Sequence, residues 1–275
     1  MARPMTPAEE QEYRGYFPNL NTRTAIVTDE AIPIYNCIAW TVGVTSQWLW
    51  PGSHINDFDL FYRRFGFGRE AQGQVAAWGH SAAGMTHGCV SGPDHGPRWE
   101  SKCGRGLRIQ HGLNELVGAS YGRVIAFYRR PSLQESRAAK LMLLLMEDRR
   151  EFTEDEIALL REEINRLDPR LVQDFNKNFS FWKETWFKDR LAIDSDPTSR
   201  VGSFEFFRLL NMGDAIIPLV VNELIQPDNF IALQLYDRLQ NEPRLLVEHS
   251  AEDDLILEGE QGRAHRTVRT YIRNR

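Results

Sequence analysis

A cysteine and a histidine in the first half of the chain have the residue types of a thiol nucleophile and its base. Cys37 follows Asn36, a good helix cap, and precedes Ile38 and Trp40. A cysteine in the first turn of a helix lies beside unsatisfied backbone N–H groups, which favour the nucleophilic thiolate. We therefore expect Cys37 to attack carbonyl carbon atoms. The alternative is a buried structural cysteine, the commoner role beside such apolar neighbours.

His87 is the expected base for this thiol. It stands at the start of an expected strand between Thr86 and Gly88, and these small neighbours leave room for a substrate. His80 lies in a turn and is less well positioned. An imidazole within hydrogen-bond reach of the thiol would accept its proton, provided that a third group orients the ring.

The register of a hairpin suggests that third group. If the turn after Val90 is centred near Asp94, Ser101 lies opposite His87 and its hydroxyl can hold the ring. A one-residue slip turns the other face of the strand toward His87. The alternatives to Ser101 are therefore Glu100, Lys102 and, from the following loop, His111.

The same residues could instead bind zinc. His87 and Cys89 with Cys103, or His80 with His87, offer nitrogen and sulfur ligands. Their spacing matches no standard zinc finger or ribbon. A zinc-binding domain is therefore an alternative to the thiol reaction, for which we expect neither a metal nor a cofactor.

The composition is that of a globular protein. The chain has 275 residues, of which 42% are hydrophobic and 26% charged, and its net charge of −5 argues against a general polyanion binder. Its three cysteines cannot all pair with one another, which favours free thiols in a reducing compartment. The longest apolar runs fall far short of the roughly 20 residues of a membrane helix, and the N-terminus lacks a signal peptide. We therefore expect a cytoplasmic protein without a membrane partner.

The segments that must position these side chains fall into two regions. We expect residues 1–30 to have little periodicity, a helix opening at Cys37, and a second helix over Ile55–Phe65. Short strands separated by glycine and proline follow, which is typical of an antiparallel meander. The expected strands are Val75–Trp78, Met85–Val90, Trp99–Cys103 and Arg123–Tyr128, with Ile109–His111 in a loop.

The composition changes at Pro131, where we place a boundary between an α+β domain, residues 1–131, and an α-helical domain, residues 132–275. Thr153 with Glu156 forms a capping box at the start of one expected helix. The remaining expected elements are a helix over Ser132–Arg149, an aromatic-rich stretch near residues 175–187, and short helices over Ser203–Leu210, Met212–Ile225 and Asn229–Gln240. This half is expected to serve as a scaffold or to bind a protein partner or a second copy.

Several motifs together resemble a largely uncharacterised domain of bacterial and fungal proteins that looks like a papain-like or NlpC/P60-like cysteine hydrolase. They are Asn36–Trp40, Trp50-Pro51, Thr86-His87, Trp99–Gly104, Ile109–His111 and Tyr121–Val124. The resemblance covers about residues 30–131. Residues 181–186 and 211–219 also resemble a helical companion segment of this domain, and the second of them looks like a HEAT-type helix pair.

The resemblance implies a papain-like helix and antiparallel meander, with Cys37 as nucleophile, His87 as base and Ser101 as third member. It also implies that the remaining conspicuous side chains of these motifs bind substrate: Trp40, Trp99, Lys102 and His111. No asparagine or aspartate stands on the strand where papain-like enzymes usually carry one. The Cys37 N–H could provide one donor to an oxyanion.

The expected reaction is acyl transfer through a Cys37 thioester, by which an amide or ester is hydrolysed or its acyl group passes to an amine. The substrate would be a small molecule, a peptide or an acyl donor. Two arginine-rich runs, residues 98–130 and 263–275, leave a nucleic-acid contact as a lesser alternative. A non-catalytic binding or regulatory module that keeps the papain-like fold is the alternative from another functional class.

Overall fold

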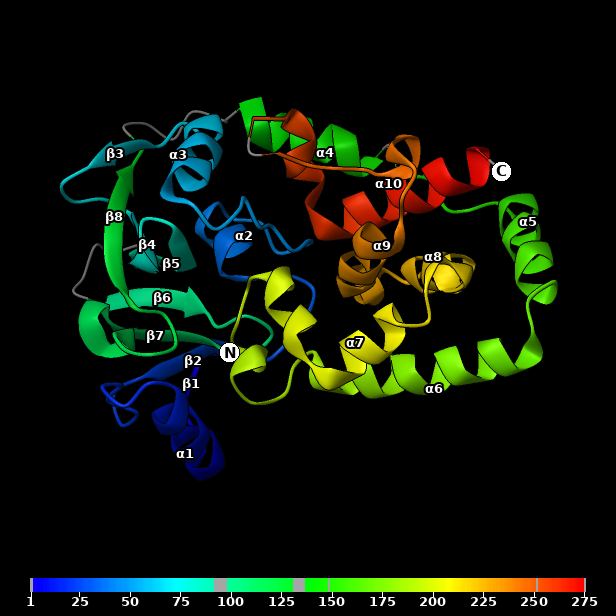
Figure 1. Cartoon of the computed structure of the whole chain (residues 1–275). Helices are drawn as coiled ribbons and strands as arrows, with labels where there is room; N and C mark the ends of the chain where they lie inside the picture. Colours follow the sequence, from blue (N-terminus) through cyan, green and yellow to red (C-terminus); the bar gives the residue numbers. More distant parts are fainter. Residues whose placement is uncertain (1, 92–97, 131–136, 148, 251, 275) are drawn as a thin grey trace.

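The computed structural model describes residues 2–91, 98–130, 137–147, 149–250 and 252–274. Within these ranges, eight strands form one antiparallel sheet in the order β1-β2-β7-β6-β5-β4-β8-β3. The strands are β1 Arg3–Pro4, β2 Ile26–Asp29, β3 Gly68–Glu70, β4 Val75–Ser81, β5 Gly84–Ser91, β6 Arg98–Lys102, β7 Arg108–Gly112 and β8 Arg123–Arg129. The protein is thus α+β, with helices filling its C-terminal half, as the sequence predicts. Figure 1 shows the sheet on the left and this helical half on the right.

The four predicted strands correspond to β4, β5, β6 and β8, but the assignment of Ile109–His111 to a loop is wrong. These residues belong to β7, which pairs with β6 and β2. Ile109 and His111 are buried while Gln110 between them is only half-buried. The alternation of a strand is therefore present, but one of its inward positions is a histidine, which a hydrophobicity pattern does not reveal.

The interpretation of residues 1–30 as a segment with little periodicity missed one helix and two strands. Helix α1, Pro7–Tyr16, begins with a capping box in which Thr6 accepts from the Glu9 N–H and Glu9 accepts from the Thr6 N–H. Tyr13 packs its ring among the buried residues of the sheet, and β2 joins the sheet beside β7. The start of α1 could have been recognised in the sequence, because a threonine cap is followed by proline at the first helical position and glutamate at the third.

Two helices cover one face of the sheet. Helix α2, Cys37–Thr41, is capped by Asn36 as predicted, because the Asn36 side chain accepts from the Ala39 N–H at 3.1 Å. Helix α3, Ile55–Arg64, begins at the predicted residue and is capped by His54, whose side chain accepts from the Asn56 N–H. Figure 1 shows α2 between the sheet and the helical half.

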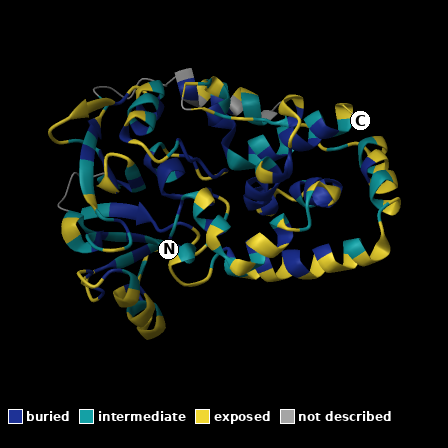
Figure 2. Cartoon of the chain, viewed as in Figure 1, coloured by how far each residue is buried: buried dark blue, intermediate teal, exposed yellow. Residues whose placement is uncertain are grey.

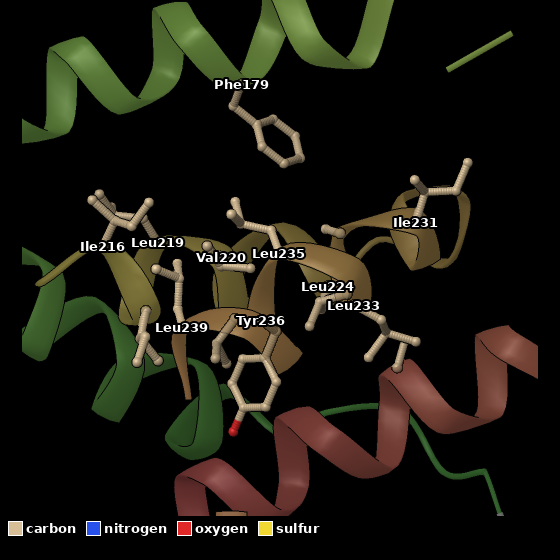
Figure 3. Close-up of a cluster of buried hydrophobic side chains, with 14 of the residues drawn as sticks. Phe179, Ile216, Leu219, Val220, Leu224, Ile231, Leu233, Leu235, Tyr236 and Leu239 are labelled. Atoms are coloured by element: carbon tan, nitrogen blue, oxygen red, sulfur yellow. The ribbon is translucent and has the colours of Figure 1, made fainter. Parts of the chain in front are cut away.

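The helical half contains α4 Arg137–Glu147, α5 Glu154–Asn165, α6 Pro169–Thr185, α7 Phe204–Leu210, α8 Ile217–Leu224, α9 Leu233–Leu239 and α10 Gly259–Arg273. The predicted capping box of Thr153 and Glu156 is confirmed at the start of α5. The aromatic-rich stretch forms the end of α6, where Phe175, Phe179 and Trp182 recur at helical spacing and are buried. Phe179 points from α6 toward α8 and α9 (Figure 3).

Residues from each half of the chain also pack in the hydrophobic core of the other half. Trp48 packs in the hydrophobic cluster of the helical half, whereas Ile193 packs against the sheet and Ile256 against α2 and α3. Buried residues therefore run continuously through the middle of the molecule, and the exposed ones lie mainly on the outer faces of helices such as α1, α5 and α6 (Figure 2). The predicted boundary at Pro131 lies outside the described residues.

In the described parts of the chain, every helix is too short or too polar to cross a lipid bilayer.

Candidate thiol site

Helix α2 brings Cys37 against the middle of β5. A Cβ atom at Gly88 would lie only 3.0 Å from the Tyr62 hydroxyl and 3.1 Å from Ile38 Cδ1, so the close approach of the helix requires glycine. The backbone N–H of Gly88 lowers the pKa of the Cys37 thiol and therefore lies near the sulfur. The thiol thus reaches the peptide group that joins His87 to Gly88.

Strands β5 and β6 separate at this point. They pair only at Val90–Glu100 and Ser91–Trp99. Continuing that register would place Cys103, not Ser101, opposite His87, so the predicted register is shifted by two residues. A shift of two keeps each side chain on the same face, and Ser101 therefore still points toward His87. The predicted turn centre, Asp94, lies outside the described residues.

His87, Ser101 and His111 form a buried chain of hydrogen bonds. The Ser101 Oγ lies 2.9 Å from the His87 Nε2 and 2.8 Å from the His111 Nε2. At the far end, the His111 Nδ1 lies 2.8 Å from the carbonyl oxygen of Gly112. All three side chains are completely buried. The predicted contact between His87 and Ser101 is confirmed, and His111, an alternative to Ser101 in the sequence analysis, joins the same chain.

The direction of this chain fixes the tautomers. The Gly112 carbonyl only accepts, so the His111 Nδ1 carries the proton and its Nε2 accepts from the Ser101 hydroxyl. The Ser101 oxygen then accepts from the His87 Nε2–H, which leaves a lone pair on the His87 Nδ1. Burial lowers the pKa of His111 to about 4 and the pKa of His87 well below its usual value, so both rings are neutral at pH 7. No described residue donates to the His87 Nδ1, although it is buried.

Aromatic rings fix the His87 imidazole in place. The ring of Tyr121 stacks on it with 3.9 Å between centroids and 6° between planes, and Trp78 meets it edge-on at 6.5 Å. Burial raises the pKa of Tyr121 well above its usual value, and Cys103 and Cys37 add to the rise. No hydrogen bond joins Cys37 to His87 among the contacts of these two described residues. Cys37 packs on the face of the sheet that carries Ala77, whereas His87 lies opposite Trp78 and points to the other face, so the expected contact between thiol and imidazole is absent from this structure.

Cys37 is paired instead with a residue from the helical half. Its thiol donates to the Ser195 hydroxyl oxygen at 3.1 Å. Burial raises the pKa of the Cys37 thiol to about 11, and the nearby Ser195 hydroxyl and the Gly88 and Ile38 N–H groups lower it only in part. The expected activation of the thiol by the helix terminus is therefore outweighed by desolvation in this conformation.

Ser195 belongs to a covering segment, which we define as Asp189–Gly202. Its carbonyl groups accept hydrogen bonds from the sheet domain: Tyr121 Oη to Ile193 O at 2.9 Å, Arg105 N to Ala192 O at 2.9 Å, and Trp48 Nε1 to Ser195 O at 2.8 Å. Gly104 allows the segment to approach, since a Cβ atom there would lie 2.6 Å from the Ile193 carbonyl carbon. The segment thus contacts the ring beside His87 as well as the thiol.

A buried arginine holds the covering segment together. Only 1% of Arg200 is exposed, and its guanidinium donates to the carbonyls of Leu191 at 2.7 Å and Asp194 at 2.8 Å, as well as to those of Trp186 and Asp196. The fork of five donors in arginine is suited to several carbonyls at once.

Lys102, an expected substrate-binding residue, has its ammonium group engaged within the fold. The Nζ donates to the carbonyls of Ile32 at 3.1 Å, Gly104 at 2.8 Å and Gly106 at 2.6 Å. Burial lowers its pKa to about 8. In this conformation Lys102 fastens the loop after β6 and offers no donor to a substrate.

The two expected substrate-binding tryptophans lie in different places. The ring of Trp40 on α2 is covered by the Arg108 guanidinium at 4.0 Å. Trp99 on β6 lines a surface cavity of about 570 Å³ with Phe127 and Leu113. His111, the fourth residue of that set, is buried in the hydrogen-bonded chain.

Sequence reasoning missed Ser195 and the covering segment, because no local pattern reports a contact across 158 positions. The motif Tyr121–Val124 was part of the sequence analysis, but the Tyr121 ring was given no role. Among the described residues, no three His, Cys, Asp or Glu side chains come together as a metal site. The zinc alternative therefore has no ligand set in these parts of the chain.

Residues 26–129 match a family described as a domain of unknown function, DUF7689. No curated protein and no solved structure matches the chain. The matched region contains Cys37, His87, Ser101 and His111, whereas Ser195 lies beyond its end.

Proposed function

We propose that the sheet domain is a latent thiol-dependent acyl-transfer site, with Cys37 as nucleophile and His87 as base, which the covering segment keeps closed. The observation that supports it best is the His87 Nδ1. Ser101 and His111 orient this ring so that a lone pair remains unused in a buried place, where an unsatisfied polar atom costs about 1–3 kcal/mol. A purely structural histidine would gain from a donor at that position.

Because Cys37 and His87 lie on opposite faces of β5, the reaction requires a rearrangement that brings the sulfur to the His87 Nδ1, and it would then begin by proton transfer from the thiol to that nitrogen. The thiolate would attack a carbonyl carbon, and the Gly88 and Ile38 N–H groups that now face the sulfur lie close to the developing charge. The imidazolium would return the proton to the leaving amine or alcohol, which leaves a thioester on Cys37. Attack by water or by an amine then releases the acyl group and regenerates the thiol.

The covering segment explains why the thiol is not activated in the resting conformation. The bond to Ser195 directs the thiol proton away from His87, and burial raises the thiol pKa. Displacing Ser195 would free the sulfur and admit water and substrate. Ile193 is buried against the sheet, so this displacement has a substantial free-energy cost and would need a partner, a substrate or cleavage to drive it.

Labelling of the native thiols along a urea gradient tests this proposal. Cys37, Cys89 and Cys103 are all completely buried, and burial raises the pKa of each thiol. Local displacement of the covering segment would remove the Ser195 contact of Cys37 and expose its sulfur, at a rate that depends little on urea. We expect iodoacetamide to modify Cys37 ahead of the other two below the unfolding transition.

Capture of the thioester tests the chemistry. Wild-type protein would be incubated with p-nitrophenyl esters of several acids and analysed by peptide mass spectrometry. Acylation of Cys37 should disappear in Cys37→Ser and fall strongly in His87→Asn, while Cys89→Ser retains it. Equal labelling of all three thiols with one steep urea dependence, together with no acylated Cys37, would overturn the proposal.

A second candidate is a non-catalytic binding module. Two observations favour it: the sealed thiol, and exposed aromatic side chains on the outside of the helical half. Phe204 is 71% exposed, Phe207 50% and Phe181 43%. For such a module, Cys37→Ser would leave function unchanged and Phe204→Ser would abolish it, which is the reverse of the outcome for an enzyme.

A further inference from the structure

A second cavity lies far from the thiol in sequence, between the end of α4 and α10. Its volume is about 270 Å³. Five of its lining residues are arginines, and one is a glutamate: Arg149, Arg150, Arg266, Arg269, Arg273 and Glu258. Neither the family match nor the proposed acyl transfer assigns it a role.

Helix α10 supplies the basic wall through its periodicity. Arg266, Arg269 and Arg273 are spaced by three and four residues, so they share one face of the helix. The opposite face carries Ala264, Val268 and other buried residues that pack in the helical core. The apolar side thus fixes the helix, and its arginine side is turned toward the cavity.

The acidic groups near the cavity neutralise only part of this charge. Glu258 is 3% exposed and pairs with Arg266. Glu156 pairs with Arg150 at 3.0 Å. Arg273 is exposed and forms no ion pair with any described residue, and the Arg149 guanidinium is bound by neutral groups, Gln47 Oε1 and the Glu258 carbonyl. The described lining therefore keeps a positive charge in excess.

One lining group also has an unused donor. The Arg149 Nε is buried and has no hydrogen-bond partner among the described residues. A buried donor without an acceptor costs about 1–3 kcal/mol, and an anion oxygen would remove that cost once the guanidinium turns this edge toward the cavity. This observation is independent of the number of arginines.

We propose that this cavity binds a compact phosphate-bearing anion. Guanidinium forks match phosphate oxygens in pairs, and a charge-assisted hydrogen bond is about twice as strong as a neutral one. A water molecule occupies about 30 Å³ in the liquid, so the cavity holds the volume of roughly nine waters. That is room for one or two phosphate groups, whereas a nucleic-acid strand would need a groove that continues beyond the cavity.

Calorimetric titration of the full-length protein with sodium pyrophosphate, and separately with inorganic phosphate, in low-salt buffer tests the proposal. The variant Arg150→Gln/Arg273→Gln removes two lining charges but leaves the pair of Arg266 with Glu258. The control Arg170→Gln/Arg208→Gln removes two exposed arginines from α6 and α7, which do not line the cavity. We expect wild type and control to bind pyrophosphate equally and the first variant at least about tenfold more weakly, since 1.4 kcal/mol corresponds to a factor of ten.

Two results would overturn the proposal. One is the absence of binding of either phosphate compound to the wild type. The other is equal weakening in both double variants, which would indicate general charge attraction. A 12-nucleotide RNA that binds and is not displaced by pyrophosphate would assign the basic surface to nucleic acid instead. Circular dichroism and urea unfolding of each variant establish that its fold is intact.

Discussion

The hydroxyl oxygen of Ser195 lies 3.1 Å from the sulfur of Cys37, although 158 positions separate the two residues. This contact joins the helical half to the first turn of α2, the place where a thiol nucleophile would have to be free. Burial of the thiol raises its pKa, and the Ser195 hydroxyl opposes that rise only in part. In the proposed function, the activity of the site depends on movement of the covering segment.

Removing the Ser195 hydroxyl should make Cys37 more accessible. A hydrogen bond contributes about 1 kcal/mol net, so Ser195→Ala should raise the population of the displaced segment by roughly fivefold. The rate of iodoacetamide modification of Cys37, measured by peptide mass spectrometry without urea, should rise by the same factor. Thr153→Ala is the control, because it removes the cap of α5 at a cost of about 1 kcal/mol away from the segment. Equal acceleration in both variants would mean that Cys37 is exposed only by general loss of stability.

Arg200→Lys should loosen the covering segment more strongly. Lysine cannot reach the carbonyls that the guanidinium now binds, and each unpaired buried carbonyl costs about 1–3 kcal/mol. We expect a loss of about 2–4 kcal/mol in the free energy of unfolding by urea titration, and faster modification of Cys37 relative to Cys89. Cys89 is the internal reference because it is buried beside Trp78, to which it is hydrogen-bonded. An unchanged ratio of the two rates would show that Arg200 stabilises the fold without holding the cover.

Acid should destabilise the protein through its buried histidines. Burial lowers the pKa of His111 to about 4, whereas the unfolded residue titrates near 6.5. Between these values the unfolded state binds the proton and the folded state does not, so stability is lost as the pH falls from 6.5 toward 4. A shift of this size is worth on the order of 3 kcal/mol. His87 acts in the same direction.

The comparison of His111→Asn with wild type isolates that contribution. Urea midpoints between pH 7 and pH 4.5 should fall less steeply in the variant, and some slope should remain because burial also lowers the pKa of His249. His80→Asn, which replaces an exposed histidine, is the control for the loss of a histidine as such. A variant slope identical to that of wild type would contradict the buried, neutral state of His111.

Four of the eight strands, β4, β5, β6 and β8, could be predicted from the sequence, because they are short apolar runs bounded by glycine and proline. Strands β1, β2 and β3 were missed because they are only two to four residues long, and β7 because its inward histidine makes the strand appear polar. Helix α6 was named only as an aromatic stretch, although Phe175, Phe179 and Trp182 follow helical spacing. The cap of α2 by Asn36 succeeded because capping depends on neighbouring residues alone.

Only part of the candidate site could be predicted from the sequence. Contacts within the hairpin, such as that of His87 with Ser101, follow from the alternation of side chains and survive an error of two residues in register. The link from Ser101 to His111 requires β7, and the link from Cys37 to Ser195 requires the packing of the two halves. Such packing cannot be predicted from the separation of two residues along the chain or from their residue types. The reactivity of Cys37 was for the same reason predicted from its helix turn and not from its burial.

Lys102→Met should reduce stability without a direct effect on substrate binding. The substitution removes the donor of three carbonyl hydrogen bonds, and we expect a loss of about 2–4 kcal/mol in the free energy of unfolding. Lys177→Met, an exposed position on α6, is the matched control and should change stability by less than about 0.5 kcal/mol. Once an acyl donor that modifies Cys37 is known, KM should be unchanged in Lys102→Met at a temperature where the variant is folded. A raised KM in the folded variant, with stability like that of wild type, would instead return Lys102 to the substrate-binding role predicted from the sequence.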